Sequence, residues 1–176
     1  MVVPVYQRPY SWSEENCEQL WQDVLSVARR GTSSHFTGSV VWVQDGTMSA
    51  NGVTPRLAID GQQRITTVML LVIALARHAR KHPTVELPFS VDEIVDRGYL
   101  VDKYRKGDDR YKLTLSETDR DTLCALVENV VDPAVPLPGD GGRLVDNLDF
   151  FEERLEGLGD VGLVWSGLRR LEIVSI

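Results

Sequence analysis

The run from Arg56 to Arg80 constrains the fold more than any other part of the sequence. Residues Arg56–Ile59 have the pattern of a short strand, Asp60-Gly61 breaks it, and a helix is predicted from about Gln63 to Arg80. Apolar residues lie on all sides of that helix, which is typical of a helix buried at the centre of a core. Its longest apolar run, Val68–Ala76, is too short to span a bilayer. We therefore expect a globular domain built around this helix.

The remaining elements are predicted to pack around it. Strands are expected over Phe36–Val43, Lys112–Leu115 and Leu171–Ile176. One helix is expected after a cap at Ser11 or Ser13 and another after a cap at Ser116 or Thr118. A further helix is expected through Leu144–Leu155, and a short helix or turn over Val161–Leu168. Ser11 with Glu14 matches a capping box. The polar loop Gln44–Pro55 is short enough for the strands on either side of it to pair antiparallel. This mixed order, without regular βαβ alternation, predicts one α+β domain over residues 1–176 with a small mixed sheet.

Charge and cysteine usage limit the function classes. The formal net charge is −7, whereas a protein that holds DNA through a broad basic face is usually basic. Any contact with nucleic acid must therefore be local, or must rest on another part of a longer protein. Cys17 and Cys124 are far apart and form no CxxC motif, which argues against a zinc site or a disulfide framework. With no signal peptide at the start, this pattern fits a reducing cytoplasm.

The corner between the short strand and the long helix carries the clearest chemistry. Gly61 permits a sharp turn, and the first N–H groups of the helix have no partner within it, so that this end favours an anion. Arg64 adds a planar fork suited to phosphate, and Thr66 and Thr67 supply hydroxyls. Asp60 makes sense there if it holds Mg²⁺, binds a ribose hydroxyl or positions a water. A simpler interpretation makes Asp60 a helix cap and Arg64 a surface charge, and no Walker motif is present.

A second candidate is Val3–Trp12, hereafter the N-terminal segment, which combines three aromatic residues with an arginine in an extended stretch. Gln7 and Arg8 are suited to a phosphate or a base edge, with the aromatic rings as walls of a pocket. The alternative is that the aromatic rings only pack the first helix onto the sheet.

A third candidate is His35–Ser39. Gly38 inside a strand often marks close approach by a ligand or another backbone, and His35 is suited to act as an acid, a base or a phosphate donor. The alternative is a loop histidine beside an ordinary strand. His78 and His82 are expected to be charges at a helix end rather than metal ligands.

Taken in order, the three segments resemble the N-terminal domain of GmrSD-type, modification-dependent restriction proteins, which include SspE-like and BrxU-like members. The similarity rests on VPVYQRPYSW, HFTGSVVWV and LAIDGQQRITTVMLL, and it continues more weakly through YKLTLSETDRDTL, NLDFFEERL and the closing strand. The resemblance implies a ParB/sulfiredoxin-like α+β fold. It also implies Mg²⁺-dependent binding and hydrolysis of a nucleoside triphosphate, with GTP favoured, in a cytoplasmic anti-phage defence protein.

The resemblance also implies roles for individual residues. The catalytic residues of the DGQQR motif would be Asp60, Gln62, Gln63 and Arg64, and the nucleotide would be bound by Gly61, Arg8, Thr66, Thr67 and His35. Asp60 would hold Mg²⁺, and Gln62 or Gln63 would orient the attacking water. Sensing of modified DNA, in some members a phosphorothioate, is assigned to Tyr6, Gln7, Arg8, Pro9 and Trp12.

DNA cleavage in such proteins belongs to a C-terminal HNH-type nuclease domain. The three histidines of the chain form no such motif, so we expect a domain of a longer protein that does not itself cut DNA. The expected partners are a nucleoside triphosphate, modified foreign DNA in the full-length protein, the nuclease domain and a second copy of the chain, with no membrane. Two alternatives stay open: a nucleotide-binding or modified-DNA-binding module without turnover, and a ParB-like domain that itself cleaves nucleic acid.

Overall fold

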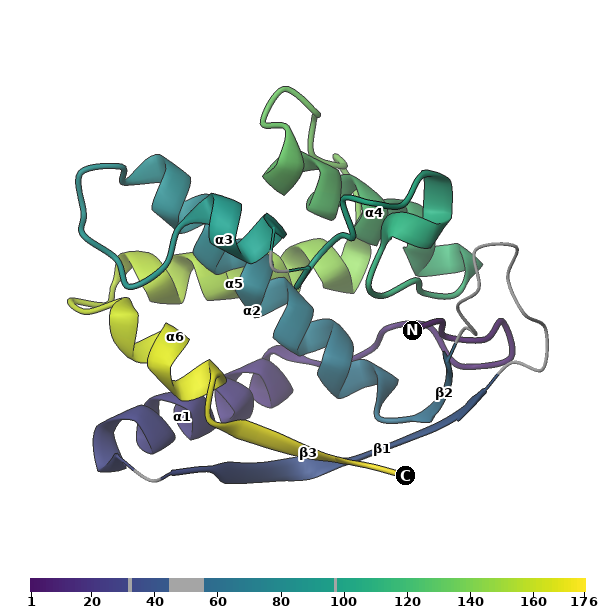
Figure 1. The fold of residues 1–176 in the computed structure, drawn as a ribbon, viewed down its shortest axis with the longest axis horizontal. Coiled ribbons are helices and arrows are strands. Elements are labelled where there is room, and N and C mark those ends of the chain that lie inside the picture. Colours follow the sequence, from purple (N-terminus) through teal and green to yellow (C-terminus); the bar gives the residue numbers. More distant parts are fainter. Residues whose placement is uncertain (32, 45–55, 97) are drawn as a thin grey trace.

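The computed structural model describes residues 1–31, 33–44, 56–96 and 98–176. Within these residues the helices are α1 (Glu14–Arg30), α2 (Gln62–Lys81), α3 (Val91–Asp96), α4 (Glu117–Val131), α5 (Gly142–Glu156) and α6 (Gly162–Leu168), with a 3₁₀ turn η1 (Gly107–Arg110), and the strands are β1 (His35–Gln44), β2 (Arg56–Asp60) and β3 (Leu171–Ser175). The helices gather on one side of the small sheet (Figure 1). This arrangement confirms the α+β class with a small mixed sheet.

The sheet has the order β2-β1-β3, with β1 in the middle. β1 pairs antiparallel with β2, as predicted, and Val41 lies opposite Asp60. β1 pairs parallel with β3, which places the end of the chain beside the strand that carries Gly38. The polar loop predicted over residues 44–55 lies outside the described residues, apart from Gln44 at the end of β1.

The strand predicted over Lys112–Leu115 is wrong. Thr114 forms only an isolated bridge to Val2, and Val2 bridges Leu57 on its other side. The contact consists of the Val3 N–H bond to the Thr114 carbonyl and the Thr114 N–H bond to the Met1 carbonyl, at 2.8 and 2.9 Å. Residues 112–115 alternate between polar side chains that are exposed or half-buried and leucines that are buried, as in a strand, but they pair with their neighbour only through this isolated bridge.

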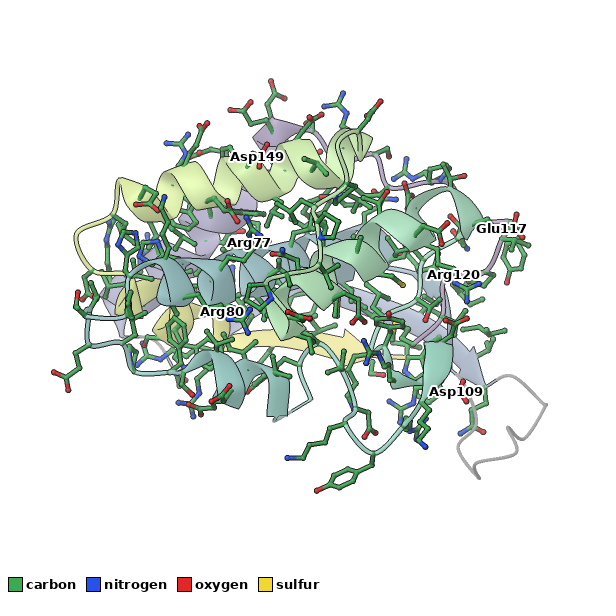
Figure 2. The ribbon with its side chains drawn as sticks, turned by 90° about the horizontal axis from the view of Figure 1, so that it is seen from above. Arg77, Arg80, Asp109, Glu117, Arg120 and Asp149 are labelled. Carbon is green, nitrogen blue, oxygen red and sulfur yellow. The ribbon has the colours of Figure 1, made fainter. Side chains whose placement is uncertain are left out.

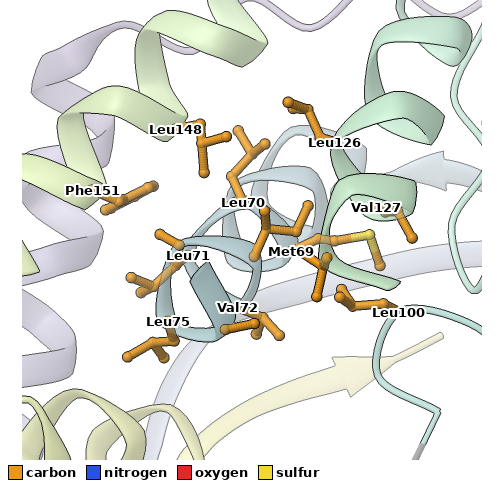
Figure 3. Close-up of a cluster of buried hydrophobic side chains, with 14 of the residues drawn as sticks. Met69, Leu70, Leu71, Val72, Leu75, Leu100, Leu126, Val127, Leu148 and Phe151 are labelled. Atoms are coloured by element: carbon orange, nitrogen blue, oxygen red, sulfur yellow. The ribbon is translucent and has the colours of Figure 1, made fainter. Parts of the chain in front are cut away.

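Helix α2 forms the centre of the core, as its pattern predicts. Every residue from Met69 to Ala76 is buried, and α2 packs most extensively against α5, with α3 and α4 on other sides. Figure 3 shows its leucines among Leu148 and Phe151 of α5 and Leu126 of α4. Each fully buried side chain of this size contributes about 1.5–3 kcal/mol. In the described part of the chain, no helix is long and apolar enough to cross a membrane.

The start of α1 confirms Ser13, one of the two predicted caps, and corrects the predicted capping box. Ser13 is the N-cap, and its backbone N–H donates to Asn16 Oδ1 at 3.0 Å, so the capping pair is Ser13 with Asn16 rather than Ser11 with Glu14. Ser11 is unavailable because its N–H donates to the Gln63 side chain at 2.8 Å. A tertiary contact to α2 has thus replaced the local one. At its other end, α1 stops at Gly31, which has φ of 64°.

Candidate functional site

One cleft brings together the N-terminal segment and the corner between β2 and α2. Its lining residues are Gln7, Arg8, Trp12, Asp60, Gly61, Gln62, Gln63 and Arg64, and its volume is about 540 Å³. Two of the three candidate segments therefore meet in space, although Trp12 at the end of the first and Asp60 in the second are 48 positions apart in the sequence.

The turn at Gly61 opens α2 directly against β1. Gly61 has φ of 86°, and a Cβ there would lie 2.8 Å from Val40 Cγ2 and 3.0 Å from the Ser39 carbonyl oxygen. The Gly61 N–H donates to its neighbour Asp60 Oδ1 at 2.8 Å, and no side chain caps the helix. The first intrahelical bond comes from the Ile65 N–H to the Gly61 carbonyl, at 3.1 Å. Asp60 therefore does not cap α2, and the N–H groups of the first turn point out of the helix end without a side-chain partner.

Arg64 links the third candidate segment to this cleft. Its guanidinium passes over Gly38 of β1, where an added Cβ would lie 2.7 Å from Arg64 Cζ. Gly38 has φ of 118°, a value that side chains disfavour. Nη1 of Arg64 faces the Ser39 carbonyl oxygen at 3.4 Å. The predicted close approach at Gly38 is thus real, and the approaching group is an arginine side chain rather than a backbone.

The Gln63 carboxamide holds the N-terminal segment onto α2. Gln63 Oε1 accepts from the Ser11 N–H at 2.8 Å, and Nε2 donates to the Pro9 carbonyl at 3.1 Å. Gln63 is only 6% exposed. Both ends of its amide are occupied by backbone, so its role in the structure is to position the segment.

Gln62 makes a second link, to Gln7. Gln62 Nε2 donates to Gln7 Oε1 at 3.1 Å, and Gln7 Nε2 donates to the Ile59 carbonyl at 3.0 Å. Among the described residues, the carboxamide oxygen of Gln62 accepts no hydrogen bond. Of the side-chain amide groups of Gln62 and Gln63, this oxygen is the one that is free to contact a ligand or a water.

A buried polar network beneath the cleft fixes the same segment from below. The Tyr10 hydroxyl lies 2.7 Å from Thr67 Oγ1 and accepts from Asn147 Nδ2 at 2.9 Å. Asn147 also donates to the Trp12 carbonyl at 3.0 Å, and Asp119 Oδ2 accepts from the Tyr10 N–H at 2.6 Å. Burial raises the pKa of Tyr10, so the phenol stays protonated. Asn147 and Asp119 were missed by the sequence analysis because no local pattern marks a residue whose partner is over 100 positions away.

Several predicted ligands lie away from the cleft. Thr66 and Thr67 are buried, and their hydroxyls donate to the carbonyls of Gln62 and Gln63 at 2.8 and 2.9 Å. They bond to their own helix one turn back and are not among the described residues that line the cleft, so their assignment as nucleotide ligands stays a prediction. His35 is the first residue of β1 and is not in the described lining either, so its role also stays a prediction.

Three residues proposed to sense modified DNA differ in position. Tyr6 is 70% exposed and does not line the cleft. Pro9 is exposed and contributes its carbonyl to Gln63 rather than its ring to the cleft. Trp12 does line the cleft and packs its other side against the core.

The charges at the cleft favour an anion. Arg8 is exposed and Arg64 is half-buried, and neither forms an ion pair with a carboxylate in the described part of the chain. Asp60 is the single acidic residue among the described residues of the lining. Two unpaired guanidinium groups and the positive end of α2 thus surround one carboxylate, in a chain whose net charge is −7.

A family model described as the N-terminal domain of the GmrSD restriction endonuclease matches residues 1–153. The chain belongs to this family. The GmrSD match includes every residue that lines the cleft and ends inside α5, so α6 and β3 complete the fold beyond it. Membership makes this GmrSD N-terminal domain a component of a restriction system. None of the curated proteins matches the chain.

Proposed function

We propose that the cleft binds the phosphates of a nucleoside triphosphate and hydrolyses it, as the sensor domain of an anti-phage restriction protein. The observation that carries the proposal is the pair of guanidinium groups, Arg8 and Arg64, which line one cleft with the uncapped start of α2. Guanidinium forks suit the oxygens of a phosphate, and free N–H groups at a helix start favour the same charge. Arg64 is held over Gly38, so it reaches a phosphate with little loss of side-chain freedom.

The donor set fits Mg²⁺ bound together with phosphate. Asp60 is exposed, and its Oδ1 accepts from the Gly61 N–H, which leaves Oδ2 for a cation or a water of its shell. Mg²⁺ in such sites takes one or two carboxylates, with phosphate oxygens and waters as its other ligands. It would neutralise charge on the phosphates there. GTP is the nucleotide that we favour, from the resemblance.

Gln62 is the residue that we assign to water positioning. Its carboxamide oxygen is free among the described residues, whereas both ends of Gln63 are bound to backbone. A neutral amide orients water without repelling phosphate, but it is no strong base, so turnover is slow.

A module that binds nucleotide without turnover is the second candidate. It is favoured by the engagement of Gln63 and by a described lining that offers only one carboxylate. The same shortage weighs against a ParB-like nuclease, because two-metal cleavage of a phosphodiester needs more acidic ligands. For modified DNA, including phosphorothioate, Arg8 and Trp12 are the residues of the N-terminal segment that stay available at the cleft.

Nucleotide binding and phosphate release should be measured on the wild type and on Arg64→Ala, Arg8→Ala and Arg30→Ala. Arg30 is an exposed arginine at the end of α1 and serves as the matched control. Release that persists in Arg30→Ala and vanishes in the two cleft variants supports hydrolysis. Tight binding with no release above background supports the second candidate, metal-dependent nicking of plasmid DNA supports the nuclease, and a wild type that binds no nucleotide overturns the proposal.

A further inference from the structure

The far end of α2 carries a second cluster, independent of the cleft. His78 and His82 are one helical turn apart and face Glu156, the last residue of α5. Their candidate ligand atoms all lie within 4.8 Å of one another. The cluster is about 24 Å along α2 from its first turn. From the sequence these histidines are expected to be charges at a helix end, because nothing local places a carboxylate beside them.

The distances within the cluster suit a metal ion. His82 Nε2 lies 3.1 Å from both carboxylate oxygens of Glu156, and His78 Nδ1 lies 3.8 Å from Glu156 Oε1. In a tetrahedral zinc site with bonds of about 2.0–2.1 Å, two ligand atoms are separated by roughly 3.3 Å. The observed separations from Glu156 lie on either side of this value, so small rotations of the side chains would bring these ligand atoms to the spacing of a zinc site.

His78 supplies an independent sign of a missing ligand. Its side chain is 9% exposed, and Nδ1 is buried without a hydrogen-bond partner in the described part of the chain. Buried polar atoms nearly always have a partner, so an orphaned ring nitrogen calls for one.

We propose that His78, His82 and Glu156 bind one divalent transition-metal ion of the zinc class. Two imidazoles and one carboxylate are ligands that zinc takes, and two histidines four residues apart on a helix are a known way to present them. His78 and Glu156 also line a cavity of about 960 Å³, whose other lining residues come from α2, α4 and α5 and from the segment after α4. Figure 2 shows two of them, Arg77 of α2 and Asp149 of α5.

The ion would join the C-terminal ends of α2 and α5, which are 75 residues apart in the sequence. Lys81 now partly fills this role, since its Nζ lies 2.7 Å from Glu156 Oε1. Lys81 is 67% exposed and free to swing into solvent, so it competes with the metal without blocking the site. Removal of the Lys81 charge should therefore tighten metal binding.

The test is a calorimetric titration of the full chain with ZnCl₂, with Co²⁺ absorption spectra to report the coordination geometry. The variants are His82→Gln and Glu156→Gln, both at accessible positions, Lys81→Gln, and His35→Gln as the control histidine. We expect one Zn²⁺ per chain. The two ligand variants should lose affinity on the order of 100-fold, which is the upper end of the effect of an outer-shell partner. Lys81→Gln should bind Zn²⁺ more tightly, and His35→Gln should bind it as the wild type does.

Either of two results would overturn the proposal. The first is a folded wild type that binds no Zn²⁺ at concentrations of about 100 µM. The second is undiminished binding by His82→Gln, which would place the ion elsewhere. Circular dichroism of each variant distinguishes loss of the site from loss of the fold.

Discussion

At the scale of the residue, the contact between Gly38 and Arg64 determines the geometry of the cleft. Arg64 faces the cleft because β1 has no side chain at the point where the guanidinium crosses it. Substitution of this glycine tests that contact without touching any group that meets the ligand.

Gly38→Ala should displace the Arg64 guanidinium and weaken nucleotide binding by about 10- to 100-fold, because a hydrogen bond to a charged group is worth about 1.5–3 kcal/mol. Gly31→Ala is the matched control, since Gly31 also has a positive φ but has no atom within 4 Å of an added Cβ. Both variants carry backbone strain of about 1–3 kcal/mol. Equal nucleotide affinity in the two, measured by titration, would contradict the role given to Gly38.

How far the sequence predicts single residues depends on where their partners lie. Gly61 and Arg64 were identified because a glycine turn, a helix start and an arginine are adjacent in the sequence. Gln63 was expected to orient water, yet its amide bonds to Pro9 and to Ser11, which only the folded chain brings near. His78 was expected to be a simple charge, for the same reason.

At the scale of the element, the ends of α2 and α5 are held by Glu156. Hydrogen bonds from Lys81 and then from His82 lower its pKa to about 2, from an ordinary value of 4.5. A carboxyl whose pKa is depressed in the folded state stabilises that state above its unfolded pKa. This contribution is lost as the pH falls from about 4.5 toward 2.

Thermal unfolding of the wild type and of Glu156→Gln should therefore be compared across pH in the presence of a chelator. We expect the wild type to melt higher above pH 5 and the difference in Tm to shrink steadily as the pH falls toward 2. The charged groups that face Glu156 are Lys81, His82 and His78. A difference in Tm that is constant over this range would show that the carboxylate charge contributes nothing to the α2–α5 contact.

The helices that the sequence predicted from long apolar periodicity are α1, α2, α4 and α5. The short α3 and the turn η1 have too few residues to show a period, and they were not predicted. The strand over Lys112–Leu115 is the opposite kind of error, because it was predicted and is not formed. Its strand-like pattern reflects burial next to Met1–Val3 rather than pairing in a ladder. In a short sequence, an extended segment that is only buried and a strand that is paired have the same apolar pattern.

At the scale of the whole molecule, β3 completes the site from the end of the chain. β2 pairs with residues 41–44 of β1, whereas β3 pairs with residues 35–40 (Figure 1). The half of β1 that carries Gly38 is thus held by β3. The helical core around α2 contains no residue of β3 among its fully buried members.

A chain that ends after Arg170 should keep most of its helical signal in circular dichroism but lose nucleotide binding. The free energy of unfolding should fall by roughly 2–5 kcal/mol, for a few ladder hydrogen bonds of about 0.5–1.5 kcal/mol each. A chain that ends after Ser175 loses only the backbone bonds of Ile176 to Val40 and Trp42, keeps the pairing of residues 35–39, and is the control. Full nucleotide affinity in the shorter chain would mean that β1 holds its shape without β3.

The attachment of the N-terminal segment through Gln63 has a consequence for divergence within the family. Gln63 bonds to the N–H of residue 11 and to the carbonyl of residue 9, and every amino acid at position 9 and every one except proline at position 11 offers the same groups. The path of the segment is therefore insensitive to most of its side chains. Substitutions at Arg8 and Trp12 can therefore change the chemistry of the cleft while the path of the segment stays the same.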